Sequence, residues 1–284
     1  MTLTLELGAL LTFFLCRGRL PHQSELEESE SIIQSFGSIR RGFSVLQRML
    51  GKDDWEVVSQ VHKNNVLVYL ALAKFGKRTA FAKMPFDLKL DIKAFFSSYK
   101  KACALADQLL FMAGEQEAVL KAARQATVGK RLPDSLYIHK SSVELLPPLL
   151  RVYEGCARYF LGEVEAANLI KLHLLEPKVS YLSYPSFDKD PHPSLAFSLL
   201  VDFRKYKIKE RDYSERANPP ILHRKEEFVD EGYPGREKFA KLTRQEVKWG
   251  LYEAPGYIGT RDGWNEMLKL KGAVLKGHRL YRVK

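Results

Sequence analysis

Three side chains that can bind a metal ion lie close together in one short segment. Asp188, Asp190 and His192 occupy alternate positions of FDKDPHP. The two prolines of this segment favour an extended chain, in which alternate side chains point to the same side. Carboxylate oxygens and an imidazole nitrogen can hold Mg²⁺ or Mn²⁺. The segment therefore predicts one of two things. One is a divalent metal site that activates water for attack on a phosphodiester, with His223 as a further donor; the other is a solvated loop whose Asp side chains cap local turns.

Basic residues gather in the second half of the chain. Four cations alternate with other residues over 205–211, and a strand there would present them on one face. A second basic group follows at 223–225, and the last sixteen residues add six basic side chains and no acidic one. Clustered cations can bind phosphates, although the polar face of a half-buried sheet has the same pattern. The residues that we expect to bind nucleic acid are Lys205, Lys207, Lys209, Arg211, His223, Arg224 and Lys225.

The composition agrees with a folded protein that has a polyanionic partner. The 284 residues contain 45 Lys and Arg against 34 Asp and Glu, which gives a net charge of +11. A hydrophobic content of 45% excludes a mostly disordered chain. Three scattered cysteines exclude a disulfide framework and favour a reducing, cytoplasmic location.

Several classes of enzyme are excluded by the motifs that the sequence lacks. It contains no GxGxxG, no P-loop, no HExxH, no CxxC and no GxSxG. The segment Asn218-Pro219-Pro220-Ile221 has letters used by amino-methyltransferases, but Ile221 stands where an aromatic residue would stack on the target base. We therefore interpret that segment as a rigid turn, and we assign no catalytic residue.

Helices are expected before these residues, and strands around them. Residues 1–16 are apolar but too short to span a bilayer, so we expect a helix that packs its apolar face on the chain and no membrane partner. Helical spacing of apolar residues predicts helices over 24–51, 53–76, 88–112 and 115–125, with no internal repeat. Strands are predicted over 134–140, 178–184, 196–203 and 206–211; helices are predicted over 149–161 and 262–270, and an extended segment over 274–283. The sequence thus predicts an α+β protein with a helical region over 1–126 and an α+β domain over 127–284.

Several long sequence segments of the chain resemble one protein family. They are GKRLPDSLYIH at 129–139, the segments 150–173 and 177–193, RDYSERANPPILHRKEEFV at 211–229, and IGTRDGW at 258–264. Together they resemble the DNA phosphorothioation-associated methyltransferases. The helical half, with FGSIRRGF at 36–43 and LDIKAFFSSYKKAC at 90–103, is similar to the segment that precedes those phrases in the longer members.

The resemblance implies a function without implying a catalytic residue. Full-length members carry an upstream domain that binds S-adenosylmethionine, and this sequence contains no motif of that kind. We therefore expect the chain to correspond to the C-terminal portion, from a split gene or a truncated product. The resemblance then implies a DNA-associated accessory module of a phosphorothioation system for phage defence, related to restriction-modification. Its partners would be DNA and a methyltransferase domain or protein, and the cofactor would come only through that partner. The alternatives are a metal-dependent phosphodiesterase and a purely structural interaction domain.

Overall fold

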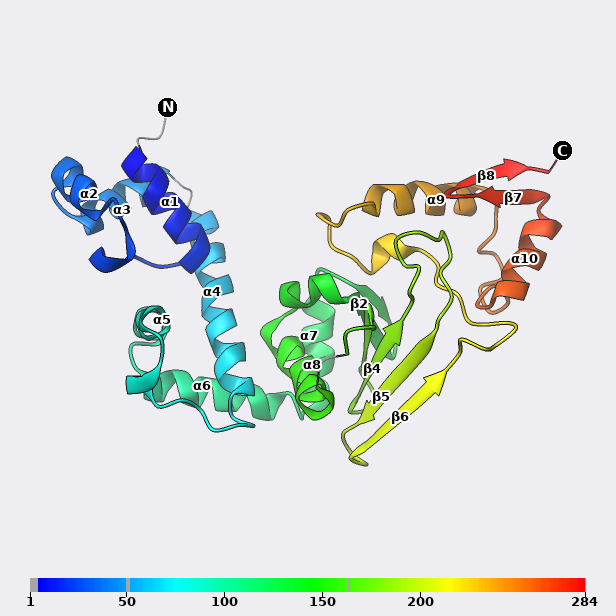
Figure 1. Cartoon of the computed structure of the whole chain (residues 1–284), viewed down its shortest axis with the longest axis horizontal. Helices are drawn as coiled ribbons and strands as arrows, with labels where there is room; N and C mark the ends of the chain where they lie inside the picture. The colour runs from blue at the N-terminus through cyan, green and yellow to red at the C-terminus, as the bar shows by residue number, and fades with distance from the viewer. Residues whose placement is uncertain (1–4, 50–51, 163, 284) are drawn as a thin grey trace. The chain divides into compact units, whose positions relative to one another are not determined.

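The computed structural model describes residues 5–49, 52–162 and 164–283. The chain divides into two compact units, residues 1–111 and 112–284 (Figure 1). The first unit is helical, and the second combines helices with antiparallel sheets. The predicted α+β class is therefore confirmed.

The first unit is built from six helices within the described residues. They are α1 (Leu5–Arg17), α2 (Ser29–Phe36), α3 (Ile39–Met49), α4 (Lys52–Leu72), α5 (Phe86–Phe96) and α6 (Tyr99–Met112), with short 3-10 turns at Gln23–Glu25 and Phe81–Lys83. The apolar face of α1 packs as expected, because Leu10 and Phe14 are buried against Ile32 and Leu46 of α2 and α3. Among the described residues, no helix combines the length and the hydropathy that crossing a bilayer requires.

Two helices that the sequence predicts as continuous are interrupted. The run predicted over 24–51 breaks at Gly37, and the run predicted over 88–112 breaks at Ser97. Both residues have a left-handed backbone, with φ of +80° and +65°, which ends a helix. The apolar spacing continues across both breaks, so periodicity alone does not reveal them. The predicted stop at Gly51 lies outside the described residues.

The second unit contains a six-stranded antiparallel sheet whose strands follow chain order. Its strands are β1 (Lys130–Leu132), β2 (Ser135–His139), β3 (Leu169–His173), β4 (Lys178–Ser183), β5 (Phe197–Asp202) and β6 (Lys207–Asp212). Neither β1 nor β3 is predicted from the sequence. The helices α7 (Gln116–Gln125) and α8 (Pro148–Leu161) lie on one side of the sheet (Figure 1). The Tyr181 hydroxyl of β4 donates to a carboxylate oxygen of Glu154 on α8 at 2.9 Å and so ties the two layers together.

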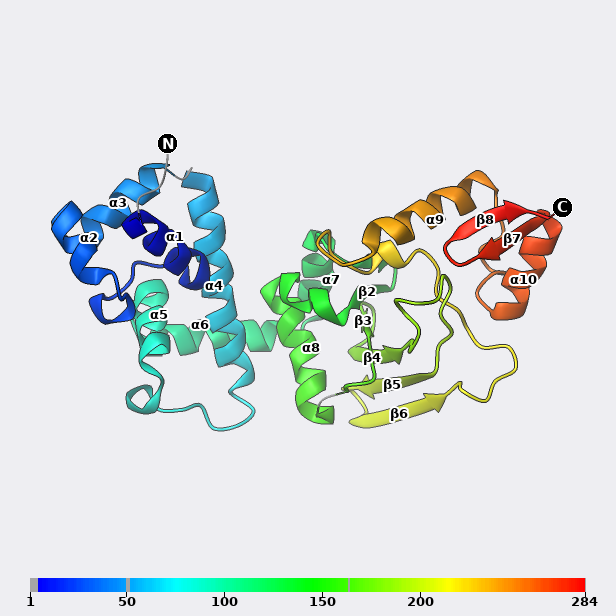
Figure 2. The same ribbon diagram turned by 45° about the horizontal axis from the view of Figure 1, so that its top comes forward.

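The remaining elements follow β6 after a long loop. They are the 3-10 turn Lys225–Glu227, α9 (Arg236–Lys248), α10 (Arg261–Leu270) and the hairpin β7 (Ala273–Lys276) with β8 (Arg279–Arg282). Another 3-10 turn, Lys140–Leu145, follows β2. The hairpin lies beside both α9 and α10 in the two views (Figure 2). Leu169, Phe187, Phe228 and Phe239 form a core that joins β3 to α9.

Candidate nucleic-acid interface

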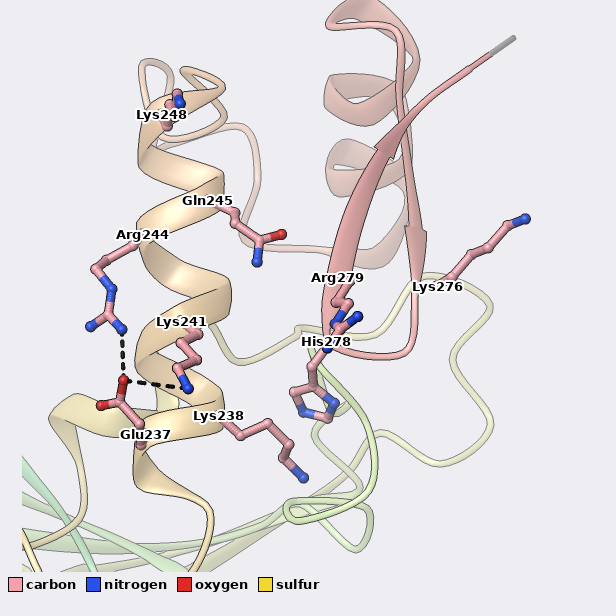
Figure 3. Close-up of a pocket in the computed structure, with 9 residues that line it drawn as sticks. All are labelled: Glu237, Lys238, Lys241, Arg244, Gln245, Lys248, Lys276, His278 and Arg279. Atoms are coloured by element: carbon pink, nitrogen blue, oxygen red, sulfur yellow. Dashed lines mark hydrogen bonds and ion pairs between the residues drawn. The ribbon is translucent and has the colours of Figure 1, made fainter.

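A basic groove lies between α9 and the hairpin β7–β8 (Figure 3). Its volume is about 950 Å³. Six cationic side chains line it together with one carboxylate, one imidazole and one amide. They are Lys238, Lys241, Arg244, Lys248, Lys276 and Arg279, with Glu237, His278 and Gln245. All six cations are exposed, so the groove presents a concentrated positive charge to solvent.

The amphipathic pattern of α9 places its cations in the groove. Phe239, Leu242 and Glu246 follow each other at steps of three and four residues, and their side chains are buried. Residues on the opposite face, such as Lys241 and Lys248, therefore face outward. The hairpin is tied to the same helix, because the backbone N–H of Leu280 donates to Oε1 of Gln245 at 3.0 Å. One wall of the groove is thus a helix face, and the other is the turn of the hairpin.

The single carboxylate neutralises only part of this charge. Glu237 accepts from Arg244 at 2.8 Å and lies 4.0 Å from the ammonium of Lys241. Within residues 164–283 as described, Lys248, Lys276 and Arg279 form no ion pair. These three cations are therefore available to an external anion.

The predicted cations at 205–211 lie mostly where the sequence placed them. Lys207, Lys209 and Arg211 alternate along β6, which is an edge strand, and all three are exposed on one face. Lys205 lies in the preceding turn, where its backbone N–H donates to Asp202 at 3.1 Å. Pairing across the sheet places Lys178 of β4 on the same face as Lys207. Because Lys178 is paired with Glu176 at 2.7 Å, we call only Lys207, Lys209 and Arg211 the basic sheet face.

The second predicted cluster turns inward instead. Nε2 of His223 donates a hydrogen bond at 2.8 Å to the carbonyl oxygen of Ile258, and burial lowers the pKa of the imidazole to about 4. The guanidinium of Arg224 lies 4.3 Å from the centre of the Tyr252 ring and pairs with Glu227. The imidazole of His223 is neutral, and the guanidinium of Arg224 already contacts the Tyr252 ring and Glu227. Neither group is therefore well placed to bind a phosphate. The expectation that 223–225 forms a surface cluster therefore needs correction.

Lys225 is the clearest departure from the expected surface cluster, because it is only 2% exposed. Its ammonium donates to the carbonyl oxygen of Phe187 at 2.6 Å and to that of Asp190, and it lies 3.9 Å from the centre of the Phe239 ring. Burial is the main cause that lowers the pKa of this ammonium to about 7. The same nitrogen is 3.5 Å from Nε2 of His278 in the groove wall. Lys225 thus packs beneath the groove.

The structure does not bring the three predicted metal ligands together. Asp188 accepts from the Tyr233 hydroxyl at 2.8 Å, Asp190 is exposed, and Nε2 of His192 is 2.7 Å from Oε1 of Glu246. The ring of His223 does lie 4.5 Å from that of His192, but each imidazole is hydrogen-bonded elsewhere. Across the three described ranges, no group of three or more His, Cys, Asp or Glu side chains is placed to hold a metal ion.

A buried polar cluster that the sequence did not suggest holds α9 in position. Glu246 of α9 is fully buried, and its two oxygens contact His192 and the hydroxyl of Tyr252, the latter at 2.5 Å. The Trp264 ring of α10 packs against the rings of His192 and His223, with centroids 4.6 Å apart in both cases. The cluster therefore connects α9 and α10 to the loop that contains His192. It holds the wall formed by α9 and the helix that directly precedes the hairpin.

The groove residues of α9 are not among the cations predicted from the sequence, although the sequence contains a signal for them. The sequence REKFAKLTRQEVK repeats cations at steps of three and four, opposite a narrow apolar stripe.

Comparison of the chain with protein-family models, with curated proteins and with solved structures gives no match.

Proposed function

We propose that this chain is a DNA-binding module and that the groove between α9 and the hairpin is its principal contact. The observation that carries the proposal is the set of six exposed cations and one carboxylate around a single groove. Phosphates of a nucleic acid backbone bind such a surface because each neutralised phosphate releases a condensed counterion. The basic sheet face adds a second row of cations in the same unit.

The wider role follows from the resemblance described above. We propose that the module works in a DNA phosphorothioation system beside a methyltransferase domain, and that this partner supplies S-adenosylmethionine. The chain has no glycine-rich loop of its own for that cofactor. In this division of labour the present chain holds the DNA and the partner carries out the chemistry.

Fluorescence anisotropy with a labelled duplex of about 20 bp tests the DNA-binding part, over salt concentrations from ~50 to ~200 mM. The groove variant replaces Lys248, Lys276 and Arg279 with alanine. These side chains are exposed and form no ion pair in the described part of the chain, so their removal leaves the fold intact. We expect the slope of log K against log salt to fall by about 0.9 for each phosphate that the variant no longer neutralises.

A charge-matched control replaces Lys121, Arg124 and Lys140, which are also exposed. The first two belong to α7, on the other side of the sheet (Figure 1). The control should keep the wild-type slope. Absence of wild-type binding at ~50 mM salt would overturn the proposal. So would equal slopes for the wild type and the groove variant.

The methyltransferase part has its own test. The chain is co-expressed with the protein encoded by the reading frame directly upstream, and the two are analysed by size-exclusion chromatography. Co-elution with a methyltransferase domain supports the proposed partnership. Separate elution would remove the partner from the proposal and leave the DNA-binding part standing.

A further inference from the structure

The first unit contains an internal repeat, contrary to the expectation from the sequence. The segments IIQSFGSIRRGFSVLQ at 32–47 and IKAFFSSYKKACALAD at 92–107 align without a gap at a separation of sixty residues. Few letters are identical, so the repeat is weak in the sequence. It becomes clear from the backbone, because α2–α3 and α5–α6 break at equivalent positions.

Equivalent hydrogen bonds form at the two breaks. The backbone N–H of Gly37 donates to the carbonyl of Ile33, and that of Ser97 donates to the carbonyl of Lys93. After each break a serine caps the next helix. The hydroxyl oxygens of Ser38 and Ser98 each accept from a backbone N–H three residues later, both at 3.2 Å.

The buried positions of the two copies also correspond. Ile32 and Ile92 are both fully buried in the first helix of each pair. Small residues, Gly42 and Ala102, occupy the same place in the second helix, and Gly42 packs against Leu10 of α1. Each copy is thus a pair of helices joined by a short turn, with a helix before it: α1 in the first copy and α4 in the second. Two helices joined by a short turn, which often contains glycine, are the arrangement of a helix-turn-helix element. The turn contains Gly37 in the first copy, and Ser97 takes its place in the second.

The two copies share one exposed feature that the fold does not require. Each second helix begins with a basic pair, Arg40–Arg41 in α3 and Lys100–Lys101 in α6, and all four side chains are exposed. None of the four forms an ion pair within the described residues of the first unit. In helix-turn-helix proteins, the start of the second helix is the part that meets DNA.

We propose that α2–α3 and α5–α6 are two helix-turn-helix elements and that their basic pairs contact duplex DNA. The inference rests on the proposed function, because both take DNA as the partner. It goes beyond that function by assigning a second DNA-binding surface to the first unit. Positive charge at equivalent exposed positions favours a polyanion over a protein partner. A helix face of this kind fits the wide major groove of B-form DNA, whereas the major groove of duplex RNA is too narrow.

The test uses the full chain and a basic-pair variant in which Arg40, Arg41, Lys100 and Lys101 are replaced with alanine. Alanine favours helix, so α3 and α6 are retained, and circular dichroism confirms this. The matched control replaces Lys77, Lys83, Lys121 and Arg124, which are also exposed. The Kd of the variant for a duplex of about 20 bp should rise about tenfold or more at ~100 mM salt, and its salt slope should fall by about 0.9 per phosphate no longer neutralised.

Binding to a single strand, together with comparison of the variants, makes the result decisive. The variant should lose less affinity for a single strand of the same length than for the duplex. Equal weakening of binding to the single strand and the duplex, or a variant that matches the control, would overturn the inference. If the groove variant binds normally and the basic-pair variant does not, the groove proposal fails and the helix-turn-helix inference stands. If the basic-pair variant binds normally and the groove variant does not, the helix-turn-helix inference fails and the groove proposal stands.

Discussion

Single residues decide how the groove is held in place, and Glu246 is the best example. It is fully buried in α9, yet both of its oxygens have partners, one from the loop before β5 and one from the segment after α9. A buried carboxylate without partners would be costly, whereas a fully hydrogen-bonded one fixes the elements that supply the partners. Nothing in the letters RQEVK reveals this burial, because glutamate is normally an exposed helix residue.

Replacement of Glu246 tests this role. Glu246→Ala leaves the His192 imidazole and the Tyr252 hydroxyl without their buried partner, and we expect a decrease of about 3 kcal/mol in the free energy of unfolding. Glu246→Gln retains one acceptor and one donor and should be less destabilised. Urea denaturation followed by circular dichroism measures both variants. A decrease for Glu246→Ala no larger than that of Lys241→Ala, a substitution on the exposed face of α9, would contradict the assignment.

Lys225 predicts a pH dependence whose sign follows from its lowered pKa. Its ammonium has a pKa of about 7 in the folded chain and an ordinary value of 10.5. Between these values the unfolded chain binds a proton that the folded chain does not, so stability must increase with pH. Relative to Lys225→Met, the wild type should gain about 1 kcal/mol per pH unit between pH 8 and 9. Urea denaturation of both proteins at each pH measures the difference, and parallel profiles would contradict the burial of the charge.

At the scale of elements, the departures from prediction are interrupted helices and elements that were not predicted at all. The segment 88–112 has an apolar stripe that continues across Ser97, so its spacing predicts one helix where there are two. The strand β3, with the sequence LIKLH, is too short for its period to separate strand from helix. In α9 only Phe239 and Leu242 form the apolar stripe, and the many charges around them conceal it. The strand β6 is predictable because its alternation is unusually regular.

The break at Ser97 carries a prediction about stability. Ser97 and Gly37 are equivalent and both have positive φ, a conformation that costs a residue with a Cβ about 1 kcal/mol and glycine almost nothing. Ser97→Gly should therefore stabilise the chain by up to about 1 kcal/mol. Gly37→Ala should destabilise it, since a Cβ at Gly37 would also lie 3.1 Å from a guanidinium nitrogen of Arg41. Thermal denaturation measures both changes. If the two substitutions change the stability of the chain in the same direction, the two turns are not equivalent.

At the scale of the whole molecule, each unit is assigned its own basic surface. The groove belongs to residues 112–284 and the two basic pairs to residues 1–111. Two surfaces on one chain bind one polymer more tightly than either alone, because the second contact forms at a high effective concentration. That gain exists only if a single duplex is long enough to reach both.

The affinity of the chain should therefore depend on the length of the duplex. Lengthening it from about 10 to about 40 bp should tighten wild-type binding at least tenfold beyond the statistical gain from additional sites. The basic-pair variant and the groove variant each retain one surface, so both should show the statistical gain alone. Anisotropy titrations at one fixed salt concentration compare the three proteins on the same series of duplexes. If the affinity of all three proteins increases equally with duplex length, the two units do not bind the same duplex, and each surface acts by itself. If only the groove variant lacks the additional gain, the first unit does not bind the duplex through its basic pairs.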